Sequence, residues 1–405
     1  AMDPDFNDTT VTSNPESFNG LQQYNQLFDA LLAKARAIKA TDPGRKNQAV
    51  IKTALAAYRS AITLAAHVER SYESDEARLF LKKNADTAFH EFAGLTLDHY
   101  AISKDRADLQ EAFNIIENNK ASVLQADLHE LALSNLAGLP QDLIGEQKRI
   151  KAELARLALL SGDEQRDSVQ ELKIRDLEIN LSKLQEKLNS NPNYQRLKFS
   201  SKQVSVDSLQ KTLSKDAAIL SYYYIGEQLL CFYISPESFG YVLTPKSQLF
   251  NNQVLKLRQL LHTTATGDRN AVRNISADLY RQLLSPVLGQ LSGKSRITII
   301  PYNEISYIPF EMLADPETND LLLKRFAISY SYSANFLGEP PPEKTSYGVL
   351  AFAPFTSTAA SLDMPILKSS ENEVRSLPGE VMLGVDATKQ NFLASVGKFP
   401  IVHLA

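Results

Sequence analysis

The chain has 405 residues, of which 43% are hydrophobic and 22% are charged, the proportions of an ordinary globular protein. Its 43 basic and 47 acidic residues give a formal net charge of −4, which argues against nucleic-acid binding by bulk charge. One cysteine, Cys231, excludes an internal disulfide and a cysteine-rich zinc module, and it favours a cytoplasmic location. No apolar run approaches the roughly 20 residues of a membrane helix and no secretory signal opens the chain, so we expect no membrane partner.

The two ends of the chain have distinctive sequences. Ala1 precedes Met2, which is typical of the remnant that tag cleavage leaves, and we expect residues 1–19 to be this remnant and a disordered N-terminus. At the other end, residues 400–405 form an apolar run that predicts a buried strand. Because natural domains seldom end inside a core strand, we expect the chain to be truncated at its C-terminus.

Residues 20–138 have the apolar periodicity of α-helices and hardly any strand signal. The pattern predicts four helices, at residues 21–40, 47–69, 75–102 and from 105 onward. Alanines and aromatic residues recur on their apolar faces, which is typical of antiparallel helix pairs in a tetratricopeptide-like α-solenoid. No clean self-match at the repeat length of about 34 residues is present, so a generic helical bundle stays open as the alternative.

Residues 139–200 are predicted to form a long helical hairpin. A seam with alternating spacings of three and four residues, typical of a coiled coil, consists of Ile174, Leu177, Leu181, Leu184 and Leu188. An upstream helix continues the pattern with Ile150, Leu154 and Leu157. Pro192 ends the second helix. The hairpin either packs within the chain, against the solenoid, or offers its seam to a partner protein.

From residue 201 the pattern changes to strands that alternate with helices, which is typical of an α/β domain. An aromatic hairpin is predicted first, with strands at 217–224 and 229–234. Helices at 251–262 and 268–291 follow, and strands are expected at 296–300, 326–330, 347–353, 380–383 and 401–404. The apolar run at 296–300 is of the parallel-sheet kind, so we expect a mainly parallel sheet in residues 201–405.

Familiar catalytic and cofactor motifs are absent from the sequence. It has no glycine-rich phosphate loop and no dinucleotide fingerprint, and we expect no cofactor. The helical stretch from His90 begins like a zinc-protease motif but has Gly94 where the second histidine is required, so we expect no metal. We interpret the histidines of the helical region as packing or surface residues; they are His67, His90, His99 and His129. Cys231 lies within an apolar strand and is expected to be buried and inert.

The order of motifs in the C-terminal half resembles the CHAT family, the caspase-like domains that are attached to tetratricopeptide repeats. The most specific block is a strand, a turn and a Pro-Phe-Glu-x-Leu sequence, from Ile299 to Leu313. Further matching stretches lie at 206–210, 279–287, 328–334, 373–375, 387–392 and 402–405. The resemblance covers residues 205–405, and residues 117–121 resemble the last repeat helix that precedes such domains.

The resemblance implies a cysteine endopeptidase of the caspase, separase and gingipain clan. In that chemistry a histidine takes a proton and a cysteine thiolate attacks the scissile carbonyl. The family's catalytic histidine is the second one in a His-x-Ala-x-His-Gly run, and His403, Leu404 and Ala405 match the first three positions. We therefore expect no catalytic residue in this chain and a catalytic histidine and cysteine beyond Ala405. His403 matches the non-catalytic histidine and is expected to pack near the site.

Three functional interpretations follow from the sequence. In the first, a bacterial peptidase acts on protein or peptide substrates and is gated by a protein partner that binds its helical repeats, while residues 1–405 alone are inactive. In the second, the chain is a non-catalytic scaffold of repeats and a pseudo-protease domain for protein–protein interaction. In the third, an unrelated α/β enzyme uses Cys231 and His403.

Overall fold

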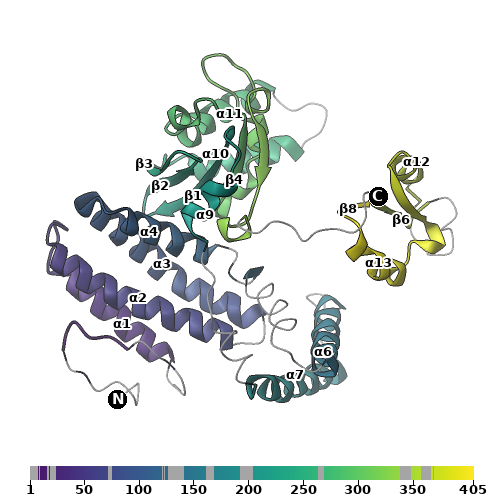
Figure 1. Ribbon diagram of the computed structural model, residues 1–405, viewed down its shortest axis with the longest axis horizontal. Helices are drawn as coiled ribbons and strands as arrows, with labels where there is room; N and C mark the ends of the chain where they lie inside the picture. The colour runs from purple at the N-terminus through teal and green to yellow at the C-terminus, as the bar shows by residue number, and fades with distance from the viewer. Residues whose placement is uncertain are drawn as a thin grey trace. The chain divides into compact units, whose positions relative to one another are not determined.

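The computed structural model describes residues 8, 10–15, 18, 24–71, 75–120, 122, 124–125, 141–160, 168–191, 204–262, 269–337, 348–356, 366–367 and 369–405. Chain contacts divide the protein into two compact units, Ala1–Gly338 and Glu339–Ala405, which are described separately (Figure 1). Most of the predicted tag remnant and N-terminal tail lies outside the described residues. Within the described residues, no helix has the length and apolar character needed to cross a membrane.

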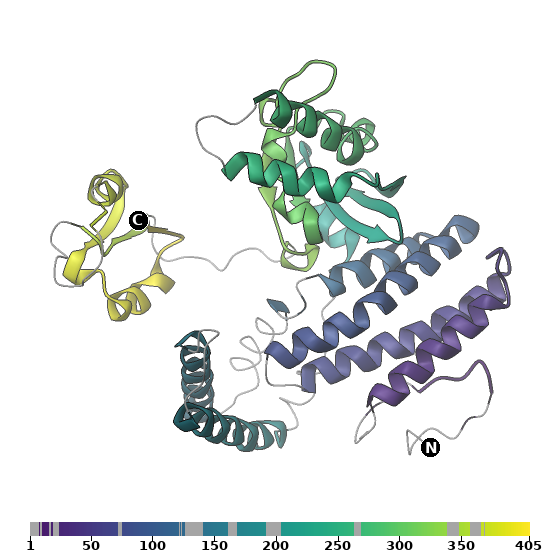
Figure 2. The same ribbon diagram turned by 180° about the vertical axis from the view of Figure 1, so that it is seen from behind.

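Four helices open the first unit: α1 (Tyr24–Ala40), α2 (Gln48–Ser71), α3 (Asp75–Ser103) and α4 (Arg106–Asn119). Each packs against the next one along the chain, as Figures 1 and 2 show. Ala54, Ala57 and Ala61 are fully buried, so the helices approach closely, and the ring of Tyr58 fills the space between them. This confirms a helical region. The tetratricopeptide-like solenoid and the generic bundle both fit successive packing, and the choice between them stays a prediction.

A separate helical hairpin consists of α6 (Gln141–Leu160) and α7 (Ser168–Asn189). The predicted seam faces inward, because Leu181 and Leu184 of α7 pack against Ile150 of α6 in a small apolar cluster. An ion pair between Lys173 and Glu153, 2.7 Å apart, also joins the two helices. The seam is therefore occupied within the hairpin. Its packing against the solenoid remains a prediction, and Pro192 lies outside the described residues.

After the short helix α9 (Val206–Thr212), the first unit continues as a five-stranded sheet with the order β3-β2-β1-β4-β5. Its strands are β1 (Ala217–Ile225), β2 (Gln228–Ile234), β3 (Phe239–Pro245), β4 (Arg296–Ile300) and β5 (Ala327–Tyr330). β1, β2 and β3 are antiparallel neighbours, whereas β4 and β5 run parallel to β1. This sheet is thus mixed, and within it the predicted parallel pairing holds for β1, β4 and β5.

The connections explain this mixed topology. Gly226, whose φ of 56° suits glycine, closes a tight turn between β1 and β2, and a tight turn can join only antiparallel strands. The crossover from β3 to β4 contains α10 (Phe250–His262) and α11 (Arg269–Leu283), which give it the length to make β4 parallel to β1. α11 ends earlier than predicted, before Pro286.

Both faces of β1 are covered, so seven consecutive residues of this strand are buried. Alternate side chains point to opposite faces of a strand. Tyr223 bonds to Asn119 of α4 on one face, and Tyr222 donates a hydrogen bond to the Leu283 carbonyl of α11 on the other. One continuous apolar core therefore includes residues of α1 to α4, of the sheet and of α10 and α11.

The second unit contains a three-stranded parallel sheet with the order β7-β6-β8. Its strands are β6 (Val349–Ala353), β7 (Gly379–Leu383) and β8 (Ile401–Leu404), and its crossovers contain α12 (Ser370–Arg375) and α13 (Lys389–Ser395). β6 is buried on both faces, against Val374 of α12 on one side and against Phe392 of α13 on the other. Gly379 has a φ of 150° and leaves no room for a Cβ beside the Val349 backbone. The predicted CHAT-like segment, residues 201–405, extends over both units.

Candidate functional site

The first candidate site is the edge of the second sheet where its parallel strands end. Because β6, β7 and β8 are parallel, their carboxyl ends lie at one edge, the usual place for a site in such sheets. His403 lies one residue before the end of β8, in register with Ala351 of β6. Its Nε2 lies 2.8 Å from Oε1 of Glu373 on α12. The carboxylate thus orients the imidazole at this edge.

His403 and Glu373 do not form a catalytic centre by themselves. The His403 side chain is 35% exposed and that of Glu373 is 55% exposed, so water screens their attraction. An imidazole can take up or release a proton near neutral pH, but cysteine chemistry also needs a thiolate. Residues 339–405 contain no cysteine. The role of His403 as a residue that packs beside a site therefore stays a prediction.

Cys231 is buried in β2, as predicted, and its surroundings disfavour the thiolate. Burial raises the pKa of the Cys231 thiol to about 12, although Tyr222 and the positive charge of Lys120 act in the opposite direction. A thiol with such a pKa is almost entirely protonated at neutral pH and is a poor nucleophile. This environment argues against the interpretation in which Cys231 and His403 form a catalytic pair.

The histidines of the helical region pack against neighbouring side chains in the described structure. The His67 ring lies against those of Phe18 and Tyr24, and Nδ1 of His99 lies 2.8 Å from Oδ2 of Asp108. His129 lies outside the described residues. Among the residues that the structure describes, no group of three or more His, Cys, Asp or Glu side chains is arranged to hold a metal ion.

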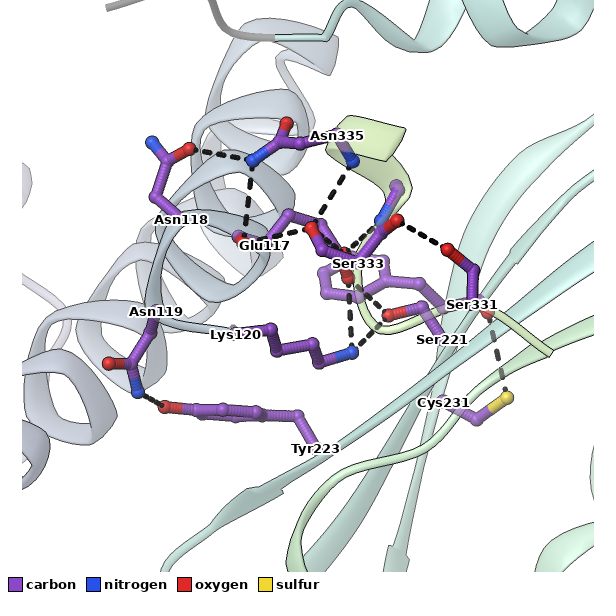
Figure 3. A network of polar contacts seen from close by, with 12 residues as sticks. Glu117, Asn118, Asn119, Lys120, Ser221, Tyr223, Cys231, Ser331, Ser333 and Asn335 are labelled. Carbon is purple, nitrogen blue, oxygen red and sulfur yellow. Dashed lines mark hydrogen bonds and ion pairs between the residues drawn. The ribbon is translucent and has the colours of Figure 1, made fainter. Parts of the chain in front are cut away.

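A second candidate site is a buried polar cluster where α4 meets the first sheet, shown in Figure 3. We call it the Glu117 cluster; its members are Glu117, Lys120, Ser221, Ser333 and the backbone N–H of Ala334. Lys120 Nζ lies 3.1 Å from Glu117 Oε1 and donates a hydrogen bond of 2.6 Å to Ser221 Oγ of β1. Glu117 Oε2 accepts hydrogen bonds from Ala334 N at 2.6 Å and from Ser333 Oγ at 3.0 Å.

The Glu117 cluster is entirely shielded from water. The Glu117 side chain is 0% exposed and that of Lys120 is 2% exposed. Burial lowers the pKa of Lys120, and the adjacent Glu117 carboxylate acts against this shift. A buried pair of charges is tolerated when further hydrogen bonds stabilise it, and here Ser221 Oγ, Ser333 Oγ and the Ala334 N–H donate to the Glu117 carboxylate. The cluster connects three separate parts of the first unit, namely α4, β1 and the turn that follows β5.

A neighbouring group, which we call the Asp86 cluster, joins α3 and α4 to the same sheet. It consists of Asp86, His90, Asn119, Tyr223 and Tyr302. Asp86 Oδ1 accepts hydrogen bonds from Asn119 Nδ2 at 2.8 Å and from Tyr302 Oη at 2.9 Å, and Asp86 Oδ2 lies 3.3 Å from His90 Nε2. Asn119 also donates a bond of 2.6 Å to Tyr223 Oη. Burial alone would raise the pKa of Asp86, but these hydrogen bonds and the His90 charge outweigh it and lower the pKa to about 2.

Neither cluster was predicted as a site from the sequence. Residues 117–121 were noted only because they resemble a repeat helix. A signal was nevertheless present in α4, because Glu117 and Lys120 continue the apolar stripe that includes Phe113 and Ile116. Two opposite charges three residues apart on a buried helix face indicate a buried ion pair. Their partners in β1 and after β5 are more than 100 residues away along the chain and could not be identified from the sequence.

The Pro-Phe-Glu-x-Leu block has a structural role in the first unit. Phe310 is fully buried, and its ring centroid lies 5.5 Å from that of Tyr222. Tyr330 Oη accepts a hydrogen bond from Phe310 N at 2.9 Å and donates one to Glu311 Oε2 at 2.7 Å. The block therefore ties the segment after β4 to the end of β5, and Phe310 packs against β1.

Residues 273–405 match the family model of the CHAT domain. No curated protein matches the chain. The matched segment begins within α11, contains the Ile299–Leu313 block and β4 to β8, and ends with His403, Leu404 and Ala405. This match supports the resemblance of the C-terminal part of the chain to the caspase-like domains of the CHAT family.

Proposed function

We propose that residues 1–405 are the regulatory helical region and the first part of the protease region of a CHAT-family cysteine endopeptidase. The observation that carries the proposal is the CHAT match over residues 273–405 together with the position of His403. His403 lies near the carboxyl end of β8, in a parallel sheet whose strand ends form one edge. A histidine two residues after Ala405 would complete the His-x-Ala-x-His-Gly run.

The proposed reaction is hydrolysis of a peptide bond in a protein or peptide substrate. A histidine and a cysteine beyond Ala405 form the catalytic pair, in which the histidine takes the thiol proton and the thiolate attacks the scissile carbonyl. His403 and Glu373 support the strand that leads to the catalytic histidine. Residues 1–405 alone are inactive in this proposal, because Cys231 is buried and protonated. The single cysteine also favours a reducing, cytoplasmic location, and we propose a bacterial source for the enzyme.

We further propose that a protein partner binds tetratricopeptide-like helices and gates the peptidase. The Glu117 and Asp86 clusters support this step, because they bond the end of α4 to β1 and to the turn after β5, and α3 to Tyr302, which follows β4. If these helices shift, either the sheet shifts with them or buried hydrogen bonds break. These buried hydrogen bonds are therefore a physical connection between the helical region and the sheet.

The first test is to read the coding sequence that follows the Ala405 codon in the source gene. The peptidase proposal expects a histidine and a glycine two and three codons later, and a cysteine on the next predicted strand. A longer protein with both residues should cleave protein or peptide substrates when its partner is present, and a Cys→Ala variant of that cysteine should not. A stop codon, or a continuation without the pair, would favour the non-catalytic scaffold.

A further inference from the structure

A pocket lies among α1, α2, α3 and the end of α4. The space between its lining side chains is about 600 Å³, which includes open solvent. Three aromatic side chains, Tyr24, Phe28 and Phe89, line it together with Leu64 and Val68. The described lining is thus mostly apolar, with a few polar groups.

The charge of the lining points to a cationic ligand. Glu69 is the only charged residue in the described lining, and its Oε1 is out of contact with water and accepts no hydrogen bond from the described residues. The Oγ of Ser122, which also lines the pocket, is buried without a hydrogen-bond partner as well. A buried carboxylate oxygen that accepts no hydrogen bond lowers the stability of the folded chain. A ligand N–H group that donated a hydrogen bond to this oxygen would remove that free-energy cost.

The apolar residues define the rest of the ligand. Aromatic faces and aliphatic side chains hold a hydrocarbon chain, and aromatic faces also attract a cation. A flexible aliphatic stem that ends in a positive charge satisfies both the apolar lining and Glu69. Lysine and arginine side chains have this chemistry, whereas a neutral apolar side chain would leave Glu69 Oε1 without a donor.

The pocket is also directly connected to the clusters that bond the helices to the sheet. Asn119 lines the pocket and donates hydrogen bonds to Asp86 and to Tyr223 of β1. Lys120, the next residue, belongs to the Glu117 cluster. A side chain in the pocket would therefore contact a residue that is itself bonded to the sheet.

We propose that this pocket receives a lysine or arginine side chain from a partner protein, with Glu69 as the acceptor of its charge. Tyr24, Phe28 and Phe89 hold the aliphatic stem, and Asn119 carries the effect of binding to the Asp86 cluster. This inference rests on the proposed gating by a protein partner, for which it supplies the contact site.

The test uses n-hexylammonium as the probe and 1-hexanol as its neutral counterpart, with the 405-residue chain. The chain contains no tryptophan, so Phe28→Trp creates a single fluorescent reporter in the lining. We expect the tryptophan fluorescence to change saturably as hexylammonium is added. Hexylammonium should bind at least about tenfold more tightly than hexanol. Saturation-transfer NMR on the unmodified chain gives a second measurement that does not depend on the tryptophan.

Glu69→Gln is the decisive variant. It should lower hexylammonium affinity about tenfold and leave hexanol affinity unchanged, while Glu186→Gln, an exposed control on α7, should change neither. The proposal is wrong if hexylammonium does not bind saturably, if hexanol binds equally well, or if Glu69→Gln has no effect. None of these binding measurements depends on peptidase activity. If a longer protein were inactive, the proposed peptidase function would be contradicted, but the binding results for the pocket would still stand.

Discussion

Glu117, in the last turn of α4, and Lys120, the residue that follows this helix, form a buried ion pair with 3.1 Å between Nζ and Oε1. Both residues belong to the helical region, but their remaining hydrogen bonds go to β1 and to the turn after β5. The pair therefore fixes the helical region to the sheet. It also makes this contact sensitive to any change that leaves one of the two charges without its partner.

Replacing Glu117 by glutamine should strongly destabilise the first unit. The amide cannot neutralise Lys120, and an uncompensated charge in a buried site costs about 3–5 kcal/mol. Urea unfolding followed by circular dichroism measures the effect. Glu111→Gln is the matched control on the same helix, because Glu111 pairs with Arg59 at the surface and such pairs contribute about 0–1 kcal/mol. Equal losses for the two variants would contradict the role assigned to the buried pair.

The helices and the central strands can be predicted from the local pattern of apolar residues in the sequence. The apolar run from Arg296 to Ile300 predicts β4 because a strand buried on both faces needs such a run. β3 was missed because it is an edge strand with Gly240 and Pro245 and only one fully buried residue. The split between the units was not predicted either. Strand pairing and unit boundaries depend on contacts between distant residues, which local periodicity does not report.

The pH dependence of stability should include a contribution from Asp86. Its pKa of about 2 lies below the ordinary value of 3.8, so its hydrogen bonds stabilise the folded chain above about pH 4. This contribution is lost as the pH falls from about 4 towards 2. The Asp86 side chain is 33% exposed, and we expect a loss of at most about 1 kcal/mol between pH 6 and pH 3.

Asp86→Asn is the variant that isolates this contribution. It should be less stable than the unmodified chain at pH 6, and the difference in free energy of unfolding should shrink at pH 3. Denaturant unfolding at both pH values measures it. A difference that stays constant with pH would show that Asp86 has an ordinary pKa in the folded chain.

Cys231 should be unreactive in the folded chain. With a thiol pKa of about 12, on the order of one molecule in ten thousand carries the thiolate at pH 8, and burial also blocks the reagent. Labelling with Ellman's reagent should be at least about 100-fold slower in buffer than in concentrated guanidinium chloride. The chain has no other cysteine, so the signal is unambiguous. Equal rates would revive the interpretation in which Cys231 is a nucleophile.

The candidate sites differ in how far the sequence could define them. The position of His403 at the end of a strand follows from the motif and from the apolar run around it. Its contact with Glu373 does not, because the two residues are 30 positions apart and meet only when β8 pairs with β6. The same holds for Ser221 and Ser333, two ordinary serines whose roles depend on where the chain places Glu117.

In a longer, active protein, His403 should be a positioning residue whose loss is tolerated. Its pair with Glu373 is partly exposed, so His403→Ala should lower kcat/KM by less than about tenfold. Replacing the next histidine of the proposed run should reduce kcat to background, because that residue is proposed to take the thiol proton. Glu373→Ala should behave like His403→Ala, since each change removes the same contact between the two side chains. Peptide-cleavage kinetics with the cognate partner present measure all three. Complete loss of activity in His403→Ala, with the fold intact by circular dichroism, would instead place His403 in the catalytic pair.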